Sequence, residues 1–279
     1  MNIENGIYTG ANERKSLVDF ELPTNMKCNN IVLFIHGYKG FKDWGCWNLV
    51  QKFFVDNGIG FCKMNLSHNG GTIDNPIDFP DLEAFGNNRY TYELEDIKAV
   101  IDWIETKINL SDYNLHLIGH SRGGGDVILS GTDSRVKSII TWASISNIES
   151  RFPTSEELEL WKSKNVRFVK NGRTKQDMPH YFSFYEDWNQ NKDRLNIEKY
   201  ARTIAEKKKN CLHIHGDQDE AVSITDSENL ARWTNGKFII INDTGHTFDS
   251  SHPWEKEKMP SKLKQVCLLT VDFVNNCQG

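Results

Sequence analysis

One short segment, an apolar run followed by a serine between glycines, limits the possible folds of this chain most strongly. The run at 115–118 leads directly into a G-x-S-x-G pattern made by Gly119, Ser121 and Gly123. A serine on a sharp turn from strand to helix has strained dihedral angles, and bulky residues two positions away would collide with the turn. The turn also places the hydroxyl at a helix N-terminus, where free N–H groups stabilise a developing negative charge. The pattern therefore predicts a strand, a nucleophilic Ser121 and a helix, in that order.

Short apolar runs alternate with helical patterns along most of the 279 residues. The runs are apolar on both faces, as in a parallel sheet that is covered on both sides, and they lie at 31–35, 59–64, 115–118, 136–143, 212–214 and 238–241. Helical spacing is found at 44–57, 92–108, 223–235 and 261–276. The alternation predicts the α/β class, with an open, mostly parallel central sheet flanked by helices. A stretch with more alternation, 16–22, predicts an antiparallel strand at one edge of the sheet.

Residues 147–190 interrupt this alternation and are polar, aromatic and poor in strand–helix order. A helix is predicted at 155–164 and a hairpin from 166–170 and 175–181. The pair Asn171-Gly172 predicts a type I′ turn between these strands, because it supplies two positive φ angles. A plain loop of this length would be unusual inside a compact domain. We therefore expect a single domain, 1–279, with a small cap inserted at 147–190.

Composition and charge exclude several classes of partner. The net charge is −5, which gives no reason to expect nucleic acid or an anionic membrane as a partner. No run approaches the ~20 apolar residues of a membrane span, and 1–14 lacks the basic and apolar regions of a secretory signal. The six cysteines have no C-x-x-C spacing, which favours free thiols in a reducing compartment over disulfides or zinc. We expect a cytoplasmic protein with no metal and no cofactor, and the oligomeric state stays open.

A serine nucleophile needs a base and an orienting acid, because the pKa of its hydroxyl lies far above neutrality. His246 follows the last predicted strand and precedes the final helix, so it lies at the same sheet edge as Ser121. Asp219 follows the penultimate strand and can accept a hydrogen bond from the His246 ring. Asp217 is the close alternative, although a turn role suits it better, and Glu220 is a weaker one. The sequence predicts Ser121, His246 and Asp219 as the catalytic residues.

The tetrahedral oxyanion of such a reaction needs two N–H donors. The turn at the serine supplies the backbone N–H of Arg122. The loop at 36–41, after the strand at 31–35, contains glycines that allow its backbone to approach a substrate, and we assign the second donor to the N–H of Tyr38. The alternative for this loop is a simple turn that ends the strand. The side chain of Arg122 has two interpretations, a partner for a substrate carboxylate or a structural salt bridge.

Four motifs in this order resemble those of a serine hydrolase of the α/β-hydrolase superfamily. The chain is similar to its esterase and dienelactone-hydrolase-like branch, which is related to the catalytic domain of prolyl-oligopeptidase-type peptidases. The likeness covers about 16–276, and the segment 173–179 resembles part of the hairpin cap of feruloyl-esterase-like relatives. A departure lies at 65–71, which replaces the Asp-x-R-G-type turn common in the superfamily. The matching motifs are His36-Gly37-Tyr38-x-Gly40, Gly119-His120-Ser121-Arg122-Gly123, His215-Gly216-x-x-Asp219-x-x-Val222 and Gly245-His246.

The resemblance implies an enzyme that cleaves a small carboxylic ester through an acyl-enzyme intermediate. A peptidase would need a larger lid or propeller, which this chain does not contain. An acyltransferase shares the same three residues but excludes water. A ligand-binding protein on the same scaffold is the alternative from another class, and it has no need of an activated nucleophile.

Several side chains are expected near the substrate. His68 and Asn69 lie on a loop that should reach the rim of the site, where they either bind substrate or stabilise a local turn. Trp44 and Tyr181 are expected to line a pocket, although aromatic side chains mostly just pack. His180 is expected at the surface.

Overall fold

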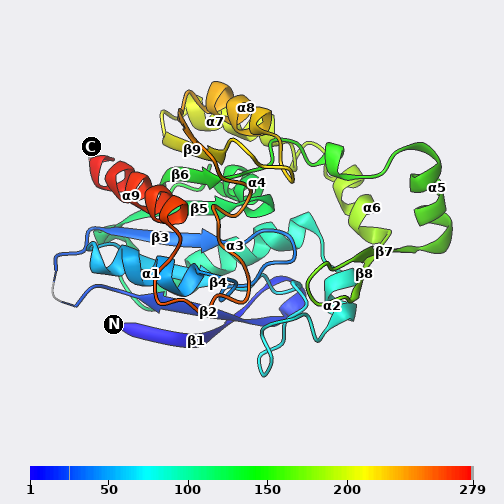
Figure 1. Ribbon diagram of the computed structural model, residues 1–279, viewed down its shortest axis with the longest axis horizontal. Helices are drawn as coiled ribbons and strands as arrows, with labels where there is room; N and C mark the ends of the chain where they lie inside the picture. Colours follow the sequence, from blue (N-terminus) through cyan, green and yellow to red (C-terminus); the bar gives the residue numbers. More distant parts are fainter. Residues whose placement is uncertain (25, 278–279) are drawn as a thin grey trace.

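The computed structural model describes residues 1–24 and 26–277, which form an eight-stranded central sheet between two layers of helices (Figure 1). The strand order is β1-β2-β4-β3-β5-β6-β9-β10. β1 pairs with β2 and β2 with β4 in antiparallel fashion, and all other neighbours are parallel. The predicted class, a mostly parallel sheet flanked by helices, is confirmed. The strands are β1 Asn2–Thr9, β2 Lys15–Glu21, β3 Asn30–Ile35, β4 Gly60–Met64, β5 Asn114–His120, β6 Val136–Trp142, β9 Asn210–Gly216 and β10 Lys237–Ile241.

The sheet separates two hydrophobic cores, and alternate side chains of strand β3 pack into each of them. Ile31, Leu33 and Ile35 pack into the core under one helical layer, while Val32 and Phe34 pack into the other. Each of these side chains is fully buried, and burying one stabilises the fold by about 1.5–3 kcal/mol. The first layer holds α3 (Tyr90–Glu105), α4 (Arg122–Ser130), α7 (Ile197–Glu206) and α8 (Ile224–Thr234), and the second holds α1 (Trp47–Asp56) and α9 (Ser261–Asn276).

The predicted edge strand at 16–22 is not at the edge. It corresponds to β2, and β1 pairs along its outer side with a register shift between Ile3 and Gly6. Most β1 side chains are exposed and polar, so β1 lacks the apolar pattern that would reveal it as a strand. Helix α7 was also absent from the predicted elements, although it covers the sheet beside α4.

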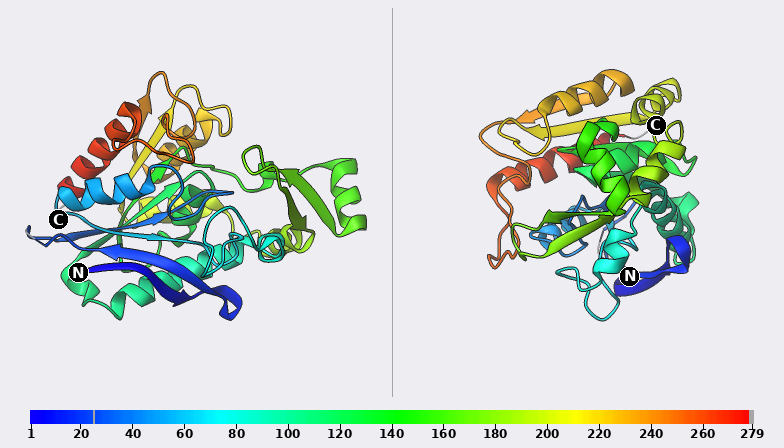
Figure 2. Two further views of the ribbon diagram at one scale, coloured as in Figure 1. Left: turned by 60° about the horizontal axis from the view of Figure 1, so that its bottom comes forward. Right: turned by 90° about the vertical axis from the view of Figure 1, so that its right-hand side faces the viewer.

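The inserted segment projects beyond the carboxyl ends of the parallel strands (Figure 2). It contains α5 (Ser155–Lys164), β7 (Val166–Lys170), β8 (Asp177–Tyr181) and α6 (Ser183–Gln190). The predicted helix at 155–164 has the bounds of α5. β8 packs against α2 (Leu82–Gly86), and α6 packs against α3, so the segment is attached to the main body at two places.

The hairpin of this segment is present, but its predicted type I′ turn is wrong. Neither Asn171 nor Gly172 has a positive φ, and the positive φ of the connection is at Lys175. The Asn171 side chain explains the difference, because its Oδ1 accepts the backbone N–H groups of Arg173 at 3.0 Å and Thr174 at 3.3 Å. These side-chain bonds stabilise a longer turn that runs to residue 176.

A buried ion cluster connects β2, β4 and the loop after β3. Lys63 is fully buried and contacts the carboxylates of Asp19 and Asp43, while Lys42 donates to Asp19 at 2.9 Å. Burial alone would raise the pKa of Asp19, but the charge of Lys63 and hydrogen bonds from Lys63 and Lys42 outweigh burial and lower it. Because the folded-state pKa is lowered, this stabilisation is present above pH 3.8 and is lost as the pH falls towards the folded-state value.

Replacing Asp19 by asparagine is expected to lower the free energy of unfolding by about 3 kcal/mol, because two buried ammonium groups lose a shared partner. Urea unfolding at pH 7 measures the change. Asp56→Ala is the matched control, because it breaks an exposed pair with Lys52 that contributes only about 0.3–0.5 kcal/mol. Equal losses in the two variants would contradict the assigned role of the buried cluster.

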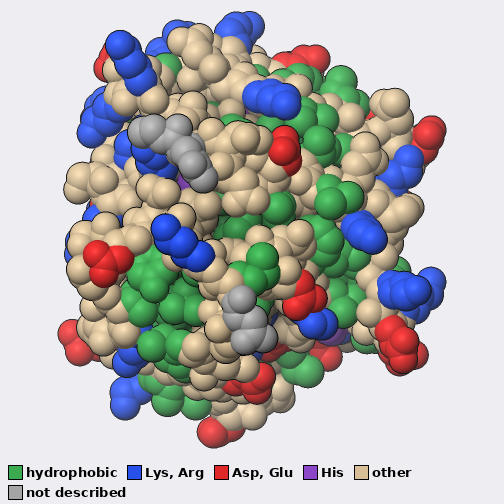
Figure 3. Space-filling model, turned by 90° about the vertical axis from the view of Figure 1, so that its left-hand side faces the viewer, with side chains coloured by type: hydrophobic (Ala, Val, Ile, Leu, Met, Phe, Trp, Pro, Cys, Tyr) green, Lys and Arg blue, Asp and Glu red, His purple; other side chains and the backbone are tan. Residues whose placement is uncertain are grey.

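The surface on the side opposite the inserted segment carries charged and apolar side chains together. Figure 3 shows lysine, arginine and acidic side chains scattered over this end, with apolar side chains between them. The face therefore presents charges of both signs rather than a single-signed field. Among the helices of the described ranges, none has the length and apolar character needed to cross a bilayer.

Candidate active site

Ser121 occupies a strained turn between β5 and α4. Its φ and ψ are 57° and −117°, values that a non-glycine residue seldom adopts and that are typical of functional positions. The turn is tight, because a Cβ on Gly119 would lie 2.1 Å from the carbonyl oxygen of Gly123. The backbone N–H of Ser121 donates to Trp142 O at 2.9 Å, which holds the turn against the neighbouring strand β6. The predicted strand, serine and helix therefore follow one another as the G-x-S-x-G pattern requires.

The loop after β3 lies directly against this turn. A Cβ on Gly37 would lie 2.8 Å from Cβ of Ser121, so this close approach requires glycine. The ring of His36 supports the loop from behind, with Nε2 accepting from the Leu66 N–H at 3.2 Å and Nδ1 donating to Gly37 O at 2.9 Å. Burial lowers the pKa of His36 to about 4, which keeps the ring neutral and able to serve both partners.

The two backbone N–H groups predicted as oxyanion donors lie on these adjacent segments. The N–H of Arg122 belongs to the first residue of α4, where helix geometry provides no partner. Neither this group nor the N–H of Tyr38 donates to any residue in the described ranges. Both donors are therefore available to a ligand oxygen.

His246 and Asp219 meet beyond the carboxyl ends of β9 and β10. His246 Nδ1 lies 2.7 Å from Asp219 Oδ2, and the other carboxylate oxygen accepts the N–H groups of Ala221 at 2.8 Å and Val222 at 2.9 Å. Burial alone would raise the pKa of Asp219, but hydrogen bonds from His215 and His246 outweigh it and hold the pKa well below its ordinary value. Asp219 is therefore a carboxylate that fixes the His246 proton on Nδ1 and leaves Nε2 as a potential base.

The alternative acid, Asp217, is exposed and takes the turn role. Its Oδ1 accepts a hydrogen bond from the Thr244 N–H at 3.4 Å. This contact joins the turn after β9 to the loop that carries His246. Asp217 thus connects the two loops without touching the His246 ring.

His215 also contacts Asp219, a contact that the sequence did not reveal. Its Nε2 lies 3.0 Å from Asp219 Oδ2 and 3.0 Å from Val222 O, so this nitrogen carries the proton. Its Nδ1 accepts from Ser227 Oγ at 2.7 Å. His215 comes directly after the strand predicted at 212–214, and only the folded turn shows that its ring reaches the carboxylate four residues later.

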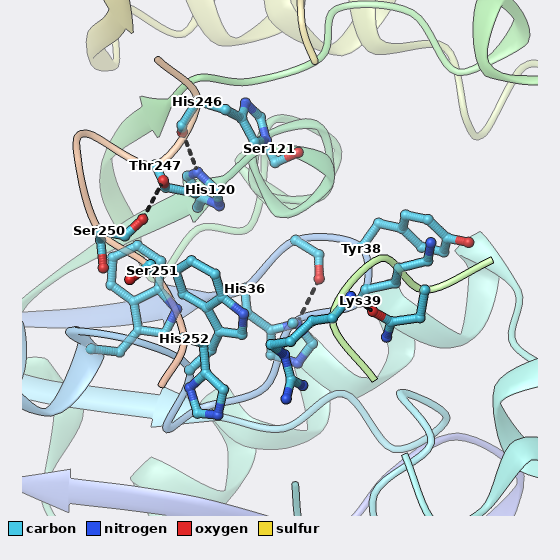
Figure 4. Close-up of a pocket in the computed structure, with 16 residues that line it drawn as sticks. His36, Tyr38, Lys39, His120, Ser121, His246, Thr247, Ser250, Ser251 and His252 are labelled. Carbon is cyan, nitrogen blue, oxygen red and sulfur yellow. Dashed lines mark hydrogen bonds between the residues drawn. The ribbon is translucent and has the colours of Figure 1, made fainter. Parts of the chain in front are cut away.

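His120 supports the loop of His246 from the other side. Its Nε2 donates to the carbonyl oxygen of His246 at 2.9 Å, and the two rings lie 4.8 Å apart between centroids. Burial lowers the pKa of His120 to about 3, so the ring is neutral. This side chain therefore helps to hold His246 beside Ser121 (Figure 4).

Two cavities meet at Ser121. The first, drawn in Figure 4, has a volume of about 430 Å³. Its walls include Trp44, Trp47 and the turn residue Arg173. The second has a volume of about 410 Å³ and lies on the side of Arg122. Ser121, His246 and Tyr38 line both cavities. A ligand whose reacting bond lies at Ser121 could therefore place one of its two parts in each cavity.

The structure brings only part of the predicted substrate contacts to these cavities. Trp44 lines the first cavity, as expected. His68 is bonded to Ser67 Oγ at 2.8 Å, and Asn69 Oδ1 accepts the Gly71 N–H at 2.9 Å. Neither residue lines either cavity, because local bonds stabilise their turn.

Tyr181 also lies outside both cavities, and its hydroxyl donates to Glu83 on α2. The period-two alternation of a strand explains this placement, because the neighbouring residue of β8, His180, points inward instead.

His180 is buried rather than at the surface. Its Nε2 lies 2.7 Å from the hydroxyl of Tyr38, and burial lowers its pKa to about 3, so a neutral ring accepts this hydrogen bond. The Arg122 guanidinium lies 4.5 Å from the centroid of the Tyr38 ring and 3.3 Å from the Glu93 carboxylate. Of the two interpretations of the Arg122 side chain, the structure shows the salt bridge. These contacts connect the inserted segment to the loop at 36–41.

Comparison with known proteins bears on the fold. No family model matches this chain, and no curated protein matches it. Est1E from Butyrivibrio proteoclasticus is 20% identical, with a TM-score of 0.70 over 98% of each chain. Monoglyceride lipase from Saccharomyces cerevisiae, solved as a soluble variant, is 14% identical, with a TM-score of 0.72 over 100% of this chain and 96% of its own. Dienelactone hydrolase from Anabaena variabilis is 14% identical, with a TM-score of 0.63 over 99% of this chain and 98% of its own.

These likenesses extend over nearly the whole chain, including the inserted segment, at an identity that establishes the fold alone. The chain therefore has the α/β-hydrolase fold that its sequence motifs predict.

Proposed function

We propose that this protein is a serine hydrolase that cleaves a carboxylic ester, with Ser121 as nucleophile, His246 as base and Asp219 as the acid that orients it. One observation carries the proposal. The strained turn of Ser121 and the imidazole of His246, held by Asp219 at 2.7 Å, border the same two cavities. A turn of this kind costs stability, and strain of this size is found where the chemistry requires it.

The reaction would proceed in two steps. His246 Nε2 accepts the proton of Ser121 as the serine Oγ attacks the ester carbonyl, and the N–H groups of Tyr38 and Arg122 stabilise the oxyanion. His246 then returns the proton to the leaving alcohol, which leaves an acyl group on Ser121. Water, deprotonated by His246, attacks this acyl group and releases the acid, and His246 returns the proton to Ser121.

The structural neighbours support hydrolysis as the reaction class. They include a lipase and a hydrolase, and one structure of Est1E holds ferulic acid. The walls of the first cavity, with Trp44 and Trp47, suit an apolar or aromatic part of an ester.

Covalent labelling tests the proposal directly. We expect a fluorophosphonate to attach to the protein at one serine, Ser121, located by peptide mass spectrometry, and Ser121→Ala protein to remain unlabelled. The same preparation should hydrolyse p-nitrophenyl acetate or butyrate. An unreactive Ser121 would indicate a ligand-binding protein, and a stable acyl-enzyme that waits for an alcohol or amine would indicate an acyltransferase. Both results would contradict the proposal.

Gly37→Ala is expected to lower kcat/KM by about 10²–10³, because the added Cβ displaces the loop that carries the Tyr38 N–H. The new atom would lie 2.8 Å from Cβ of Ser121. Steady-state hydrolysis of p-nitrophenyl acetate measures the loss. Gly172→Ala is the control, because a Cβ there meets nothing within 4 Å, and it should retain full activity. If the Gly37→Ala enzyme were as active as this control, the Tyr38 N–H on this loop would not be an oxyanion donor.

A further inference from the structure

The second cavity at Ser121 has an unusual distribution of charge. Three arginines, Arg122, Arg151 and Arg167, are among the residues that line it. No aspartate or glutamate is among the described residues that line it. A cleft lined by cationic residues beside a nucleophile favours an anionic ligand, because low-dielectric walls strengthen the attraction.

Two of these arginines already have carboxylate partners outside the cavity. Arg122 pairs with Glu93 at 3.3 Å, and Arg151 pairs with Asp226 at 2.9 Å. Their positive charges are thus balanced within the protein, and the fold accounts for their positions.

Arg167, on strand β7 of the cap, has no such partner. It is half-buried, and its guanidinium lies 4.5 Å from the centroid of the Trp161 ring. It forms no ion pair within 4.0 Å, and its buried Nε has no hydrogen-bond partner in the described ranges. The charge of Glu157 reaches it, but that side chain is too far away for a salt bridge.

Burial lowers the pKa of Arg167, which reflects the cost of removing its charge from water. Removing part of a charged group from water costs free energy, and a paired anion offsets that cost. The planar guanidinium fork matches a carboxylate in a bidentate geometry.

We propose that the substrate carries a carboxylate in addition to its ester, and that Arg167 binds this carboxylate in the second cavity. This inference rests on the proposed function, because it places the ester carbonyl at Ser121. The remaining walls include Tyr90, Phe184 and Val169, so a short apolar spacer between ester and carboxylate would pack against them. The charged group belongs to either the acyl part or the alcohol part of the ester.

Two matched pairs of esters test the charge selection. The acyl pair is the p-nitrophenyl ester of adipate with a free carboxylate and the same ester with that carboxylate methylated. The alcohol pair is 4-acetoxybenzoate and its methyl ester. In one pair we expect kcat/KM to be at least tenfold higher for the carboxylate, and the pair that shows this identifies the part of the ester that enters the second cavity. Preference for the neutral ester in both pairs would overturn the inference and leave ester hydrolysis intact.

Substitution at Arg167 tests the residue itself. Arg167→Gln is expected to lower the ratio of kcat/KM for the carboxylate ester to that for its neutral partner by about 10–100-fold. Arg167→Lys keeps the charge without the fork and should give an intermediate ratio. Lys170→Gln removes a charge from the same strand outside both cavities and should leave the ratio unchanged. An unchanged ratio in Arg167→Gln would assign Arg167 to packing on Trp161 only.

Binding measurements keep the two proposals separable. Calorimetric titration of Ser121→Ala protein with monomethyl adipate and dimethyl adipate, and with 4-acetoxybenzoate and its methyl ester, does not depend on turnover. In one pair we expect the carboxylate form to bind at least tenfold more tightly, and the additional Arg167→Gln change to abolish this difference. If the fluorophosphonate does not label Ser121 but the carboxylate form still binds more tightly than the methyl ester, the proposed function is wrong and the carboxylate site remains. Equal affinities within both pairs would overturn the carboxylate site.

Discussion

His246→Ala is expected to lower kcat for p-nitrophenyl butyrate by about 10⁶, because Ser121 then has no base to accept its proton. In a serine–histidine–aspartate triad, replacing the serine or the histidine alone lowers kcat about as much as replacing all three residues, and the expected factor of about 10⁶ follows from this. Substrate binding depends on the cavity walls, so we expect KM to change far less than kcat. Single-turnover and steady-state measurements with the same ester determine both.

The control for this prediction is His252→Ala. His252 lines the first cavity with His246, but it accepts a hydrogen bond from the Gly45 N–H at 2.9 Å and has no contact with Asp219. It should therefore retain kcat within a few-fold of the original enzyme. A His246→Ala enzyme that keeps more than a hundredth of the original kcat would show that another group activates Ser121.

Asp219→Asn is expected to lower kcat by about 10⁴, with a smaller effect on KM. An amide at this position can direct its NH₂ at His246 Nδ1, which stabilises the tautomer with the proton on Nε2 and removes the base. His215 makes the change more severe, because its own N–H lies 3.0 Å from Asp219 Oδ2 and also needs an acceptor. One amide oxygen cannot replace the carboxylate towards both rings.

Asp217→Asn is the matched control, since Asp217 lies two residues away on the same turn and the only hydrogen bond of its side chain among the described residues comes from the Thr244 N–H. It should keep kcat near that of the original enzyme. Thermal unfolding of both variants separates loss of folding from loss of catalysis. Equal losses of kcat in folded Asp217→Asn and Asp219→Asn proteins would contradict the assignment of the acid.

Much of the sheet could be predicted because its strands are buried on both faces. A run such as Ile31–Ile35 has no polar residue, and this pattern has few explanations other than a covered parallel strand. Strand β1 lacked such a pattern, because only one of its faces touches the core. The turn at 171–176 was predicted incorrectly, because the side chain of Asn171 stabilises it and a dipeptide rule does not describe such bonds.

The residues at Ser121 could be predicted where chain order places them at one sheet edge. Ser121, Asp219 and His246 each follow a parallel strand, and the carboxyl ends of such strands meet. The positions of His180 and Arg167 depend on how the inserted segment packs against the main body. A cap strand with half-exposed residues gives no sequence signal for which side chain faces a cavity.

The hairpin of the cap contributes to both cavities with different parts of its chain. Arg167 and Val169, on one face of β7, line the second cavity, whereas Asn171 and Arg173, in the turn, line the first. If the protein is the ester hydrolase proposed above, mutations in the turn would alter recognition of one half of its ester, and mutations on the strand would alter recognition of the other. Evolution or design could therefore exchange the acid component and the alcohol component of the substrate independently, without disturbing the reacting centre between them.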